Sequence, residues 1–165
     1  MAEKRLVLSD ASPLIALAAT GSFGLLRELF GAISVTAEVR GEVLAGGVRP
    51  GAMELRRGIA ARWIRLHRTA KDAPAFPRLG AGEASILSAA RAAGGDCYLL
   101  LDDEPARREA RAHDIDFTGT LGLLAVAKRR KLIPALKPRL ERLFKHGFHF
   151  SPELARTLLK DVGED

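Results

Sequence analysis

Two apolar runs in the sequence are each followed directly by acidic residues, and these acids are the first candidates for chemistry. The run C-Y-L-L-L at 97–101 is followed by D-D-E at 102–104, and the run L-V-L-S at 6–9 is followed by Asp10. Short apolar runs are typical of buried strands. Both sets of acids are therefore predicted to lie at the ends of strands.

Acids at strand ends suggest a metal site. In open α/β sheets, ligands bind beyond the carboxyl ends of the strands, where the strand order reverses. If the two apolar runs are neighbours there, Asp10, Asp102 and Asp103 converge. A like charge within about 4–6 Å raises the pKa of one carboxylate unless a cation intervenes, and Mg²⁺ or Mn²⁺ prefers oxygen ligands. Helix capping is the alternative for each acid alone, and Glu104 is expected to cap the next helix.

Two glutamates on predicted helices are further candidates. Glu42 shares one helical face with Glu38 at the i, i+4 spacing, while Val39 and Val43 share another. Glu83 begins a helix whose apolar face follows it, and the glycines before it let the chain approach closely. The alternative for each glutamate is a surface or capping position.

Short strands and amphipathic helices are predicted to alternate along the chain. The predicted strands are 5–9, 33–35, 61–66, 97–101 and 116–118. The predicted helices are 13–19, 25–30, 37–44, 50–58, 83–93, 104–113, 121–131, 134–145 and 152–162. Ser12 is expected to cap the first helix and Thr36 the third. This alternation predicts an α/β fold with a parallel sheet that helices cover on both faces, and 165 residues suit one domain over 1–165.

Composition bears on the kind of partner and the cellular compartment that we expect for this protein. The formal charge is +6 and the isoelectric point is near 10.0, which suits a polyanionic partner such as nucleic acid but also ordinary solubility. Cys97 is the single cysteine, so no internal disulfide forms, and we expect a cytoplasmic protein. No apolar run approaches the roughly 20 residues that cross a bilayer, so we expect no membrane partner.

Five short motifs, in this order, resemble the PIN-domain family, and in particular VapC-like toxin ribonucleases and an uncharacterised prokaryotic PIN-like subgroup. The motifs are S-D-A-S-P-L-I-A-L-A at 9–18, E-V-R-G-E-V at 38–43, L-G-A-G-E-A at 79–84, L-L-L-D-D-E-P-A-R-R-E-A at 99–110 and T-G-T-L-G-L-L at 118–124. The resemblance implies a three-layer fold with a five-stranded parallel sheet in the order 3-2-1-4-5. That order makes the first and fourth strands neighbours.

The resemblance also implies which residues form the site. The acids that match the family's metal ligands are Asp10, Glu42, Glu83, Asp102 and Asp103. Leu101 stands where many members have threonine, which leaves open whether Asp102 or Asp103 is the inner ligand. Ser12 and Thr120 match small hydroxyl residues near the site. Independently of the resemblance, Arg107 and Arg108 follow the acids and would either hold phosphates or pair with nearby glutamates.

The function that the resemblance implies is a Mg²⁺- or Mn²⁺-dependent endoribonuclease, the toxin of a toxin–antitoxin pair, with RNA as substrate. A small antitoxin protein and a second copy of the chain are the implied protein partners. The alternative is a catalytically degenerate PIN module that binds RNA or a protein without cutting. The helices from about residue 134 are expected to be structural or interface elements.

Overall fold

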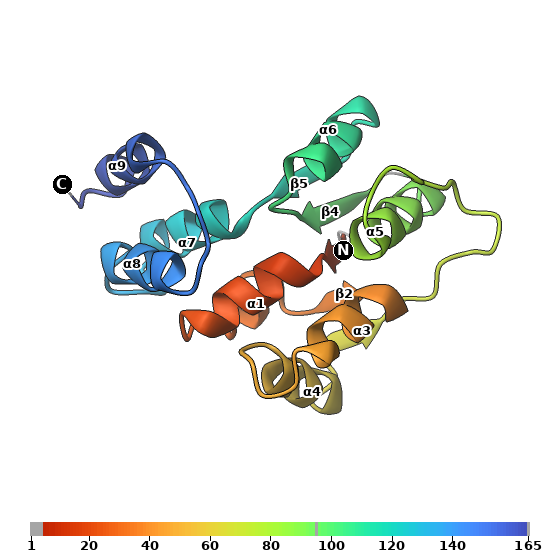
Figure 1. Cartoon of the computed structure of the whole chain (residues 1–165), viewed down its shortest axis with the longest axis horizontal. Helices are drawn as coiled ribbons and strands as arrows, with labels where there is room; N and C mark the ends of the chain where they lie inside the picture. The colour runs from red at the N-terminus through yellow and green to blue at the C-terminus, as the bar shows by residue number, and fades with distance from the viewer. Residues whose placement is uncertain (1–4, 95, 165) are drawn as a thin grey trace.

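The structure, a computed structural model, describes residues 5–94 and 96–164. At its centre is a five-stranded, all-parallel sheet in the order β3-β2-β1-β4-β5, with helices packed on both faces (Figure 1). The predicted fold class and strand order are thus confirmed. The predicted ends of the domain, residues 1 and 165, lie outside the described residues.

Strands and helices alternate as the sequence pattern predicted. The strands are β1 Leu6–Ser9, β2 Ile33–Val35, β3 Ile64–Leu66, β4 Cys97–Leu100 and β5 Asp116–Thr118. The helices are α1 Ala11–Ala19, α2 Leu25–Phe30, α3 Ala37–Ala45, α4 Ala52–Ala60, α5 Ala81–Ala92, α6 Glu104–Ala112, α7 Thr120–Arg129, α8 Lys137–Lys145 and α9 Pro152–Asp161. Each strand is joined to the next through at least one helix, as parallel pairing requires.

Strand β1 lies between β2 and β4, and the strand order reverses at this point. The chain moves outward from β1 to β3 and then returns to the other side of β1 as β4. Pairing of β1 with β4 runs from Leu6 opposite Cys97 to Ser9 opposite Leu100. The backbone N–H of Asp10 then donates to the Leu100 carbonyl (3.0 Å). Residues that follow these two strands therefore emerge side by side.

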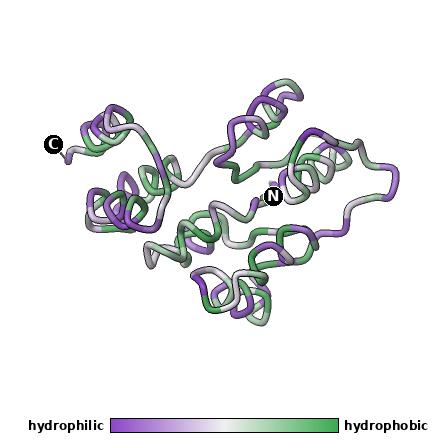
Figure 2. Tube along the Cα trace, viewed as in Figure 1, coloured by the Kyte–Doolittle hydropathy of each residue, from purple (hydrophilic) through white to green (hydrophobic). Residues whose placement is uncertain are grey.

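The apolar runs of the strands are buried because helices cover both faces of the sheet. Leu8, Leu99 and Leu100 in the central strands are fully buried, as are Leu14 and Leu17 of α1. Each such side chain contributes about 1.5–3 kcal/mol through burial. Figure 2 shows hydrophobic residues along the strands and a mixture of hydrophobic and hydrophilic residues around the helices. Strands covered on both faces give continuous apolar runs, and helices covered on one face give mixed sequences, so the two kinds of element could be told apart in the sequence.

Helix α1 begins earlier than predicted, and the proposed Ser12 cap is wrong. Asp10 occupies the N-cap position with extended backbone (φ −73°, ψ 169°), although its side chain makes no capping hydrogen bond. Ser12 lies inside the first turn. Pro13 is tolerated there because the first backbone N–H groups of a helix have no intrahelical partner. Pro13 therefore lies in the first turn of α1 but is not the first residue of the helix.

The capping residue of α6 also differs from the prediction. Asp103, and not Glu104, caps this helix by accepting a hydrogen bond from the Ala106 N–H (3.2 Å). The shorter aspartate side chain suits an N-cap better. Glu104 instead lies near Arg108 (3.8 Å) and Arg111 (2.8 Å).

Strand β3 is shorter than the predicted 61–66. Ala61 is the C-cap of α4, and Arg62 has a positive φ of 63°. A residue in this left-handed conformation turns the chain and does not continue a strand. The pairing with β2 therefore starts at Ile64.

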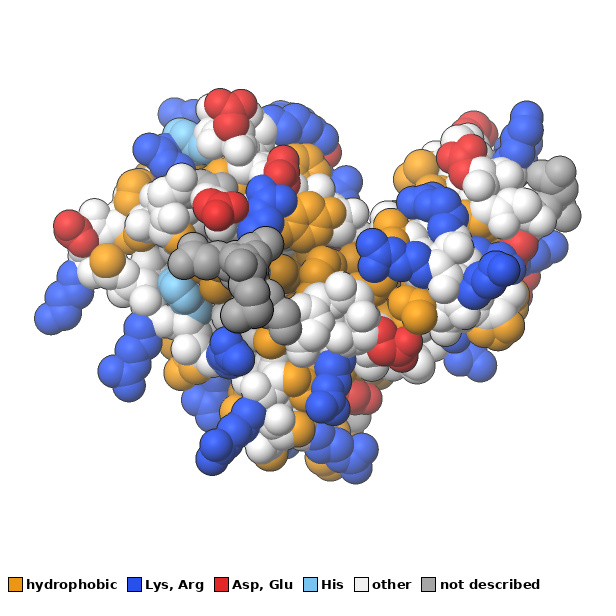
Figure 3. Space-filling view, turned by 180° about the vertical axis from the view of Figure 1, so that it is seen from behind, with side chains coloured by type: hydrophobic (Ala, Val, Ile, Leu, Met, Phe, Trp, Pro, Cys, Tyr) orange, Lys and Arg blue, Asp and Glu red, His pale blue; other side chains and the backbone are white. Residues whose placement is uncertain are grey.

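The last three helices gather at one end of the molecule, at the left of Figure 1, where α7 and α8 pack on α1. Helix α9 has no fully buried residue in its length, and Leu154 is 43% exposed. Seen from behind, the surface is hollowed between these helices and the body of the domain, and hydrophobic side chains are exposed there (Figure 3). Within the described residues, no helix has the length and apolar character needed to cross a membrane.

Candidate active site

Asp10 lies at the carboxyl end of β1 and is only 2% exposed. Among the buried side-chain nitrogen and oxygen atoms of residues 5–94 and 96–164, its Oδ1 alone lacks a hydrogen-bond partner. The pKa of Asp10 is raised to about 7, mainly by burial and to a smaller extent by the carboxylates of Glu83, Glu42 and Asp102, while the Ala11 backbone N–H lowers it. Asp10 thus sits among other acids in a position where its charge has little water around it.

Glu42 of α3 faces the same point as Asp10. Its Oε1 accepts a hydrogen bond from the backbone N–H of Gly82 in α5 (2.9 Å). A Cβ placed on Gly82 would lie 2.7 Å from Glu42 Oε1 and 2.9 Å from Asp10 Oδ1. The absence of a side chain at Gly82 therefore lets the start of α5 approach both carboxylates closely.

A second polar contact holds α3 against α5. Thr36 caps α3, as predicted, by accepting from the Val39 N–H (3.3 Å). The Thr36 hydroxyl also hydrogen-bonds the Ser85 hydroxyl of α5 (2.6 Å), and Ser85 donates to the Gly82 carbonyl (2.7 Å). Glu42 is thereby positioned by two helices that are fixed relative to each other.

Glu83 occupies the third position of α5 and is half-buried. Burial raises its pKa, and the carboxylates of Asp103 and Glu42 add to this effect. Its carboxylate folds back against Gly80, where a Cβ would lie 2.5 Å from Oε2. An acid in the first turn is stabilised by the helix N-terminus, so the electrostatic conflict with the other acids is partly offset.

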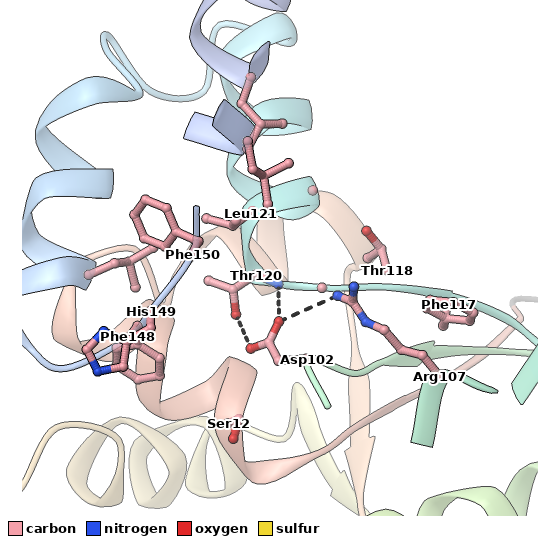
Figure 4. Close-up of a pocket in the computed structure, with 15 residues that line it drawn as sticks. Ser12, Asp102, Arg107, Phe117, Thr118, Thr120, Leu121, Phe148, His149 and Phe150 are labelled. Carbon is pink, nitrogen blue, oxygen red and sulfur yellow. Dashed lines mark hydrogen bonds and ion pairs between the residues drawn. The ribbon is translucent and has the colours of Figure 1, made fainter. Parts of the chain in front are cut away.

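Asp102 connects the end of β4 to the start of α7. Its Oδ1 accepts from the Thr120 N–H (2.7 Å), and its Oδ2 accepts from the Thr120 hydroxyl (2.6 Å). Arg107 lies 3.8 Å from Asp102 Oδ1, and its Nε donates to the Leu101 carbonyl (2.9 Å). Figure 4 shows this chain of contacts from Thr120 through Asp102 to Arg107.

The structure brings most of the predicted site residues to one edge of the sheet. The carboxylates of Asp10, Glu42, Glu83, Asp102 and Asp103 interact electrostatically there. Ser12, Thr120 and Arg107 line an adjoining pocket of about 530 Å³. Arg108 is not among the residues that line this pocket, because its side chain is 73% exposed and lies near Glu104.

Sequence reasoning missed the residues that support the acids. Gly82 donates to the carboxylate of Glu42, and Ser85 joins α5 to α3. Phe148 and Phe150 line the adjoining pocket. The glycines before Glu83 indicated that the backbone of this segment comes close to another part of the protein. They did not indicate that this part is the pair Asp10 and Glu42. No signal in the sequence connects Phe148 to Asp102.

The acids are suited to a divalent cation but do not form a closed cage. Within the described residues, no three His, Cys, Asp or Glu side chains converge tightly enough to hold a metal ion. Asp102 is engaged by Thr120, and Asp103 caps α6. Asp10 and Glu42 nevertheless direct carboxylate oxygens toward one point, and one of these oxygens is buried without a partner. A divalent cation that prefers oxygen ligands satisfies such a pair.

Comparison with known proteins is consistent with this geometry. A family model described as a PIN domain matches residues 6–164, which is nearly the whole chain. No curated protein matched the chain. PIN domains are generally nucleases that act on nucleic acids and typically use divalent metal ions. The sheet order, the acids at the β1–β4 reversal and the family match together show that this chain belongs to the PIN-domain family.

Proposed function

We propose that this protein is a metal-dependent ribonuclease that hydrolyses phosphodiester bonds of RNA. The observation that carries the proposal is the buried Asp10 carboxylate, whose unpartnered oxygen faces Glu42 beside Gly82. The residues that would hold Mg²⁺ or Mn²⁺ are Asp10, Glu42, Glu83, Asp102 and Asp103. A bound ion of this kind activates water and stabilises the leaving oxygen of a phosphodiester.

The chain's own residues would hold these oxygens in place before substrate arrives. Asp10 is fixed by the end of β1, and Glu42 is fixed by the Gly82 N–H. The guanidinium of Arg107, tethered to the Leu101 carbonyl, places a positive charge beside the acids. A fixed cation at that position is suited to binding a phosphate oxygen of the substrate.

RNA is the proposed substrate because the protein is basic outside its acidic site. The formal net charge of +6 favours association with a polyanion. A strongly negative site inside a positive molecule is then suited to holding a cation next to the backbone of the bound nucleic acid.

The central test compares wild-type protein with Asp10→Asn in an RNA cleavage assay with added Mn²⁺ or Mg²⁺. The substitution is nearly isosteric, so the fold is expected to remain while metal-dependent cleavage is lost. Asp72→Asn, which changes an exposed acid in the loop between β3 and α5, is the matched control and should cleave like wild type. Equal cleavage by Asp10→Asn and wild type would overturn the proposal.

We further propose that the nuclease is the toxin of a toxin–antitoxin pair and acts in the cytoplasm. The support is the motif likeness to VapC-like toxins. Expression in a bacterial host should arrest growth, and Asp10→Asn should not. Growth that is unaffected by the wild-type protein would exclude the toxin role while leaving the nuclease proposal to the cleavage assay.

A degenerate PIN module that binds RNA or a protein without cutting is the second candidate. The observation that favours it is the open arrangement of the acids in the described part of the chain. Thermal unfolding in a Mn²⁺ titration separates the two, since an ion that binds the folded state at 100 times its Kd stabilises it by about 2.7 kcal/mol. A rise in Tm that Asp10→Asn abolishes supports the nuclease. No rise at millimolar Mn²⁺, with RNA still bound, supports the binding module.

A further inference from the structure

The pocket beside Asp102 has a polar end and an apolar end. Ser12, Arg107 and Thr120 lie with Asp102 at the polar end. The apolar end is lined by Leu143, Phe148, Phe150, Leu154 and Leu158, with His149 as its one polar side chain. Its volume of about 530 Å³ falls in the roughly 300–1,000 Å³ range of pockets that bury small molecules. Figure 4 shows Phe148 and Phe150 on one side, Arg107 on the other, and Asp102 with Thr120 between them.

A defined turn at the end of α8 positions Phe148. Gly147 has φ +85°, which a residue with a side chain rarely adopts. The Phe148 N–H donates to the Leu143 carbonyl (3.0 Å), and the Gly147 N–H donates to the Phe144 carbonyl (3.0 Å). These two bonds form a Schellman motif, in which an apolar contact between the residues at Phe148 and Leu143 is common. Both side chains line the pocket, so its aromatic wall is fixed by backbone geometry.

The apolar end leaves surface without a partner in the described chain. Phe148 and Phe150 are half-buried, and Leu154 of α9 is 43% exposed. Aromatic faces that are open to solvent next to a nucleic-acid site are suited to stacking with bases, since every base has a π-face. Phe148 is partly exposed and lines the pocket, so part of its side chain is accessible for such a contact.

The polar end determines which kind of occupant fits the whole pocket. The Arg107 guanidinium lies over the Phe117 ring (5.6 Å from its centroid) and beside Asp102, and Ser12 is an exposed residue. A purely apolar protein side chain would leave these polar groups unmatched. A nucleotide carries an anionic phosphate and a flat apolar base in one molecule, and it matches both ends.

We infer that this pocket binds an unpaired base of the RNA, on a nucleotide that adjoins the cleaved phosphodiester. The base stacks on Phe148 while the phosphate lies toward Arg107 and the acids. The segment between α8 and α9 then determines sequence preference, separately from the acids that support cleavage. This inference rests on the proposed ribonuclease function for its substrate.

Removing one base at a time from a cleaved RNA tests the inference. A set of oligonucleotides, each with one abasic nucleotide near the cleavage site, is compared for kcat/KM. Wild-type protein should lose roughly tenfold at one position, because a base–aromatic stack is worth that much or more. Phe148→Leu keeps an apolar contact with Leu143 but has no ring, so it should cleave the intact RNA roughly tenfold more slowly and respond little to the abasic nucleotide.

Phe30→Leu is the matched control, since Phe30 is also half-buried but lines a different pocket. It should retain the full abasic effect. A wild-type protein that cleaves every abasic RNA equally well would overturn the inference and leave the ribonuclease proposal standing. RNA cleavage that Phe148→Leu does not alter would also overturn it and assign the pocket to another occupant, such as a protein partner.

A binding measurement makes the inference testable even if no RNA is cleaved. RNA that contains the fluorescent base 2-aminopurine is added to Asp10→Asn, and its quenching reports stacking while anisotropy reports binding. Quenching that Phe148→Leu removes in the Asp10→Asn background supports the pocket, even where the nuclease proposal has failed. Quenching that is unchanged by Phe148→Leu, or absent throughout, overturns the inference.

Discussion

Asp10 is a carboxylic acid in a buried position, with one oxygen that no described residue contacts. Because burial and the nearby acids Glu42 and Glu83 disfavour its charge, the pKa of Asp10 is raised from 3.8 to about 7. A fold that keeps such a group at the end of its central strand loses stability when the group ionises without a counter-ion. This residue is therefore expected to link the stability of the protein to pH and, as a proposed ligand, to divalent metal.

Asp10→Asn is expected to change how stability depends on pH. At pH values between 3.8 and about 7, Asp10 keeps its proton in the folded state but has lost it in the unfolded state. The free energy of unfolding therefore falls as the pH rises. Asparagine removes this dependence. In EDTA, the variant should be more stable than wild type at about pH 8, by an amount on the order of a few kcal/mol, and the gain should shrink toward about pH 4.

Urea denaturation over this pH range measures the difference between the two proteins. Ionisable groups that do not interact with Asp10 are common to both proteins and cancel in the comparison. A difference that is constant with pH would contradict the raised pKa. Added Mn²⁺ should stabilise wild type at the higher pH and have little effect on Asp10→Asn.

Asp102 and Asp103 are expected to differ when each is changed to asparagine. Both oxygens of Asp102 accept hydrogen bonds from Thr120, so Asp102→Asn should lower the free energy of unfolding by about 1–3 kcal/mol. Asparagine is as good an N-cap as aspartate, so Asp103→Asn should lose at most a few tenths of a kcal/mol. We expect Asp103→Asn to lose the Mn²⁺-dependent rise in Tm, because Asp103 is freer to bind the ion. Loss of the Mn²⁺ effect in Asp102→Asn alone would assign the inner ligand to Asp102.

The types and positions of the acids were predictable from the sequence, but their partners were not. Apolar runs that end in acids indicate strand ends, which is how Asp10 and Asp102 were found. The engagement of Asp102 depends on Thr120, 18 residues further along the chain, and short-range patterns carry no information on such a contact. The Glu104 error has another origin, because the bond from the Ala106 N–H to Asp103 spans only three residues and the shorter Asp side chain is the better N-cap.

At the scale of the elements, the alternation of strands and helices predicted the α/β class, and the motif likeness predicted the strand order. The predicted bounds of helices and strands are wrong mainly at their ends, where the local backbone conformation determines the first and last residue. Arg62 adopts a positive φ, which shortens β3, and α1 starts two residues before Pro13. The packing of α3 on α5 through Thr36 and Ser85 is a tertiary contact. The spacing of apolar residues within each helix does not predict it.

The contact of α5 with the two acids predicts the effect of Gly82→Ala. Alanine favours a helix by up to about 1 kcal/mol over glycine. At Gly82, however, its Cβ would lie 2.7 Å from Glu42 Oε1 and 2.9 Å from Asp10 Oδ1, so these carboxylates must move. We expect Gly82→Ala to lose metal-dependent cleavage and the Mn²⁺-dependent rise in Tm.

Gly41→Ala in α3 is the control for this helix effect. A Cβ at Gly41 meets nothing within 4 Å, so this variant should be more stable by about 0.5–1 kcal/mol and fully active. Thermal unfolding and the cleavage assay measure both properties. Normal Mn²⁺ binding by Gly82→Ala would contradict the proposed closeness of α5 to the site.

At the scale of the whole molecule, positive charge and an acidic site are combined. Lys and Arg side chains are spread over the face seen in Figure 3 and are not gathered into one patch. The net charge of +6 favours association with a polyanion such as the proposed RNA substrate, whereas the acids near Asp10 would repel its phosphates in the absence of a bound cation. Binding should therefore depend on salt through phosphate contacts made outside the acids.

RNA affinity is expected to fall steeply with salt, and Arg107 should account for part of the slope. With about four phosphate contacts, doubling the salt concentration lowers the affinity for single-stranded RNA roughly sevenfold. Arg107 lines the pocket beside Asp102, so Arg107→Gln should reduce the slope by about one contact. Fluorescence anisotropy of labelled RNA, measured in the Asp10→Asn background to prevent cleavage, gives the slope for each variant.

Arg108→Gln is the matched control, because Arg108 is the next residue in the same helix and carries the same charge. Its side chain lies outside the pocket and near Glu104, so its loss should change the affinity little and leave the slope unchanged. Both variants lower the net charge by one, and a difference between them therefore reports position and not total charge. Equal slopes for the two variants would mean that Arg107 makes no phosphate contact, and a flat salt dependence in all proteins would contradict RNA as the polyanionic partner.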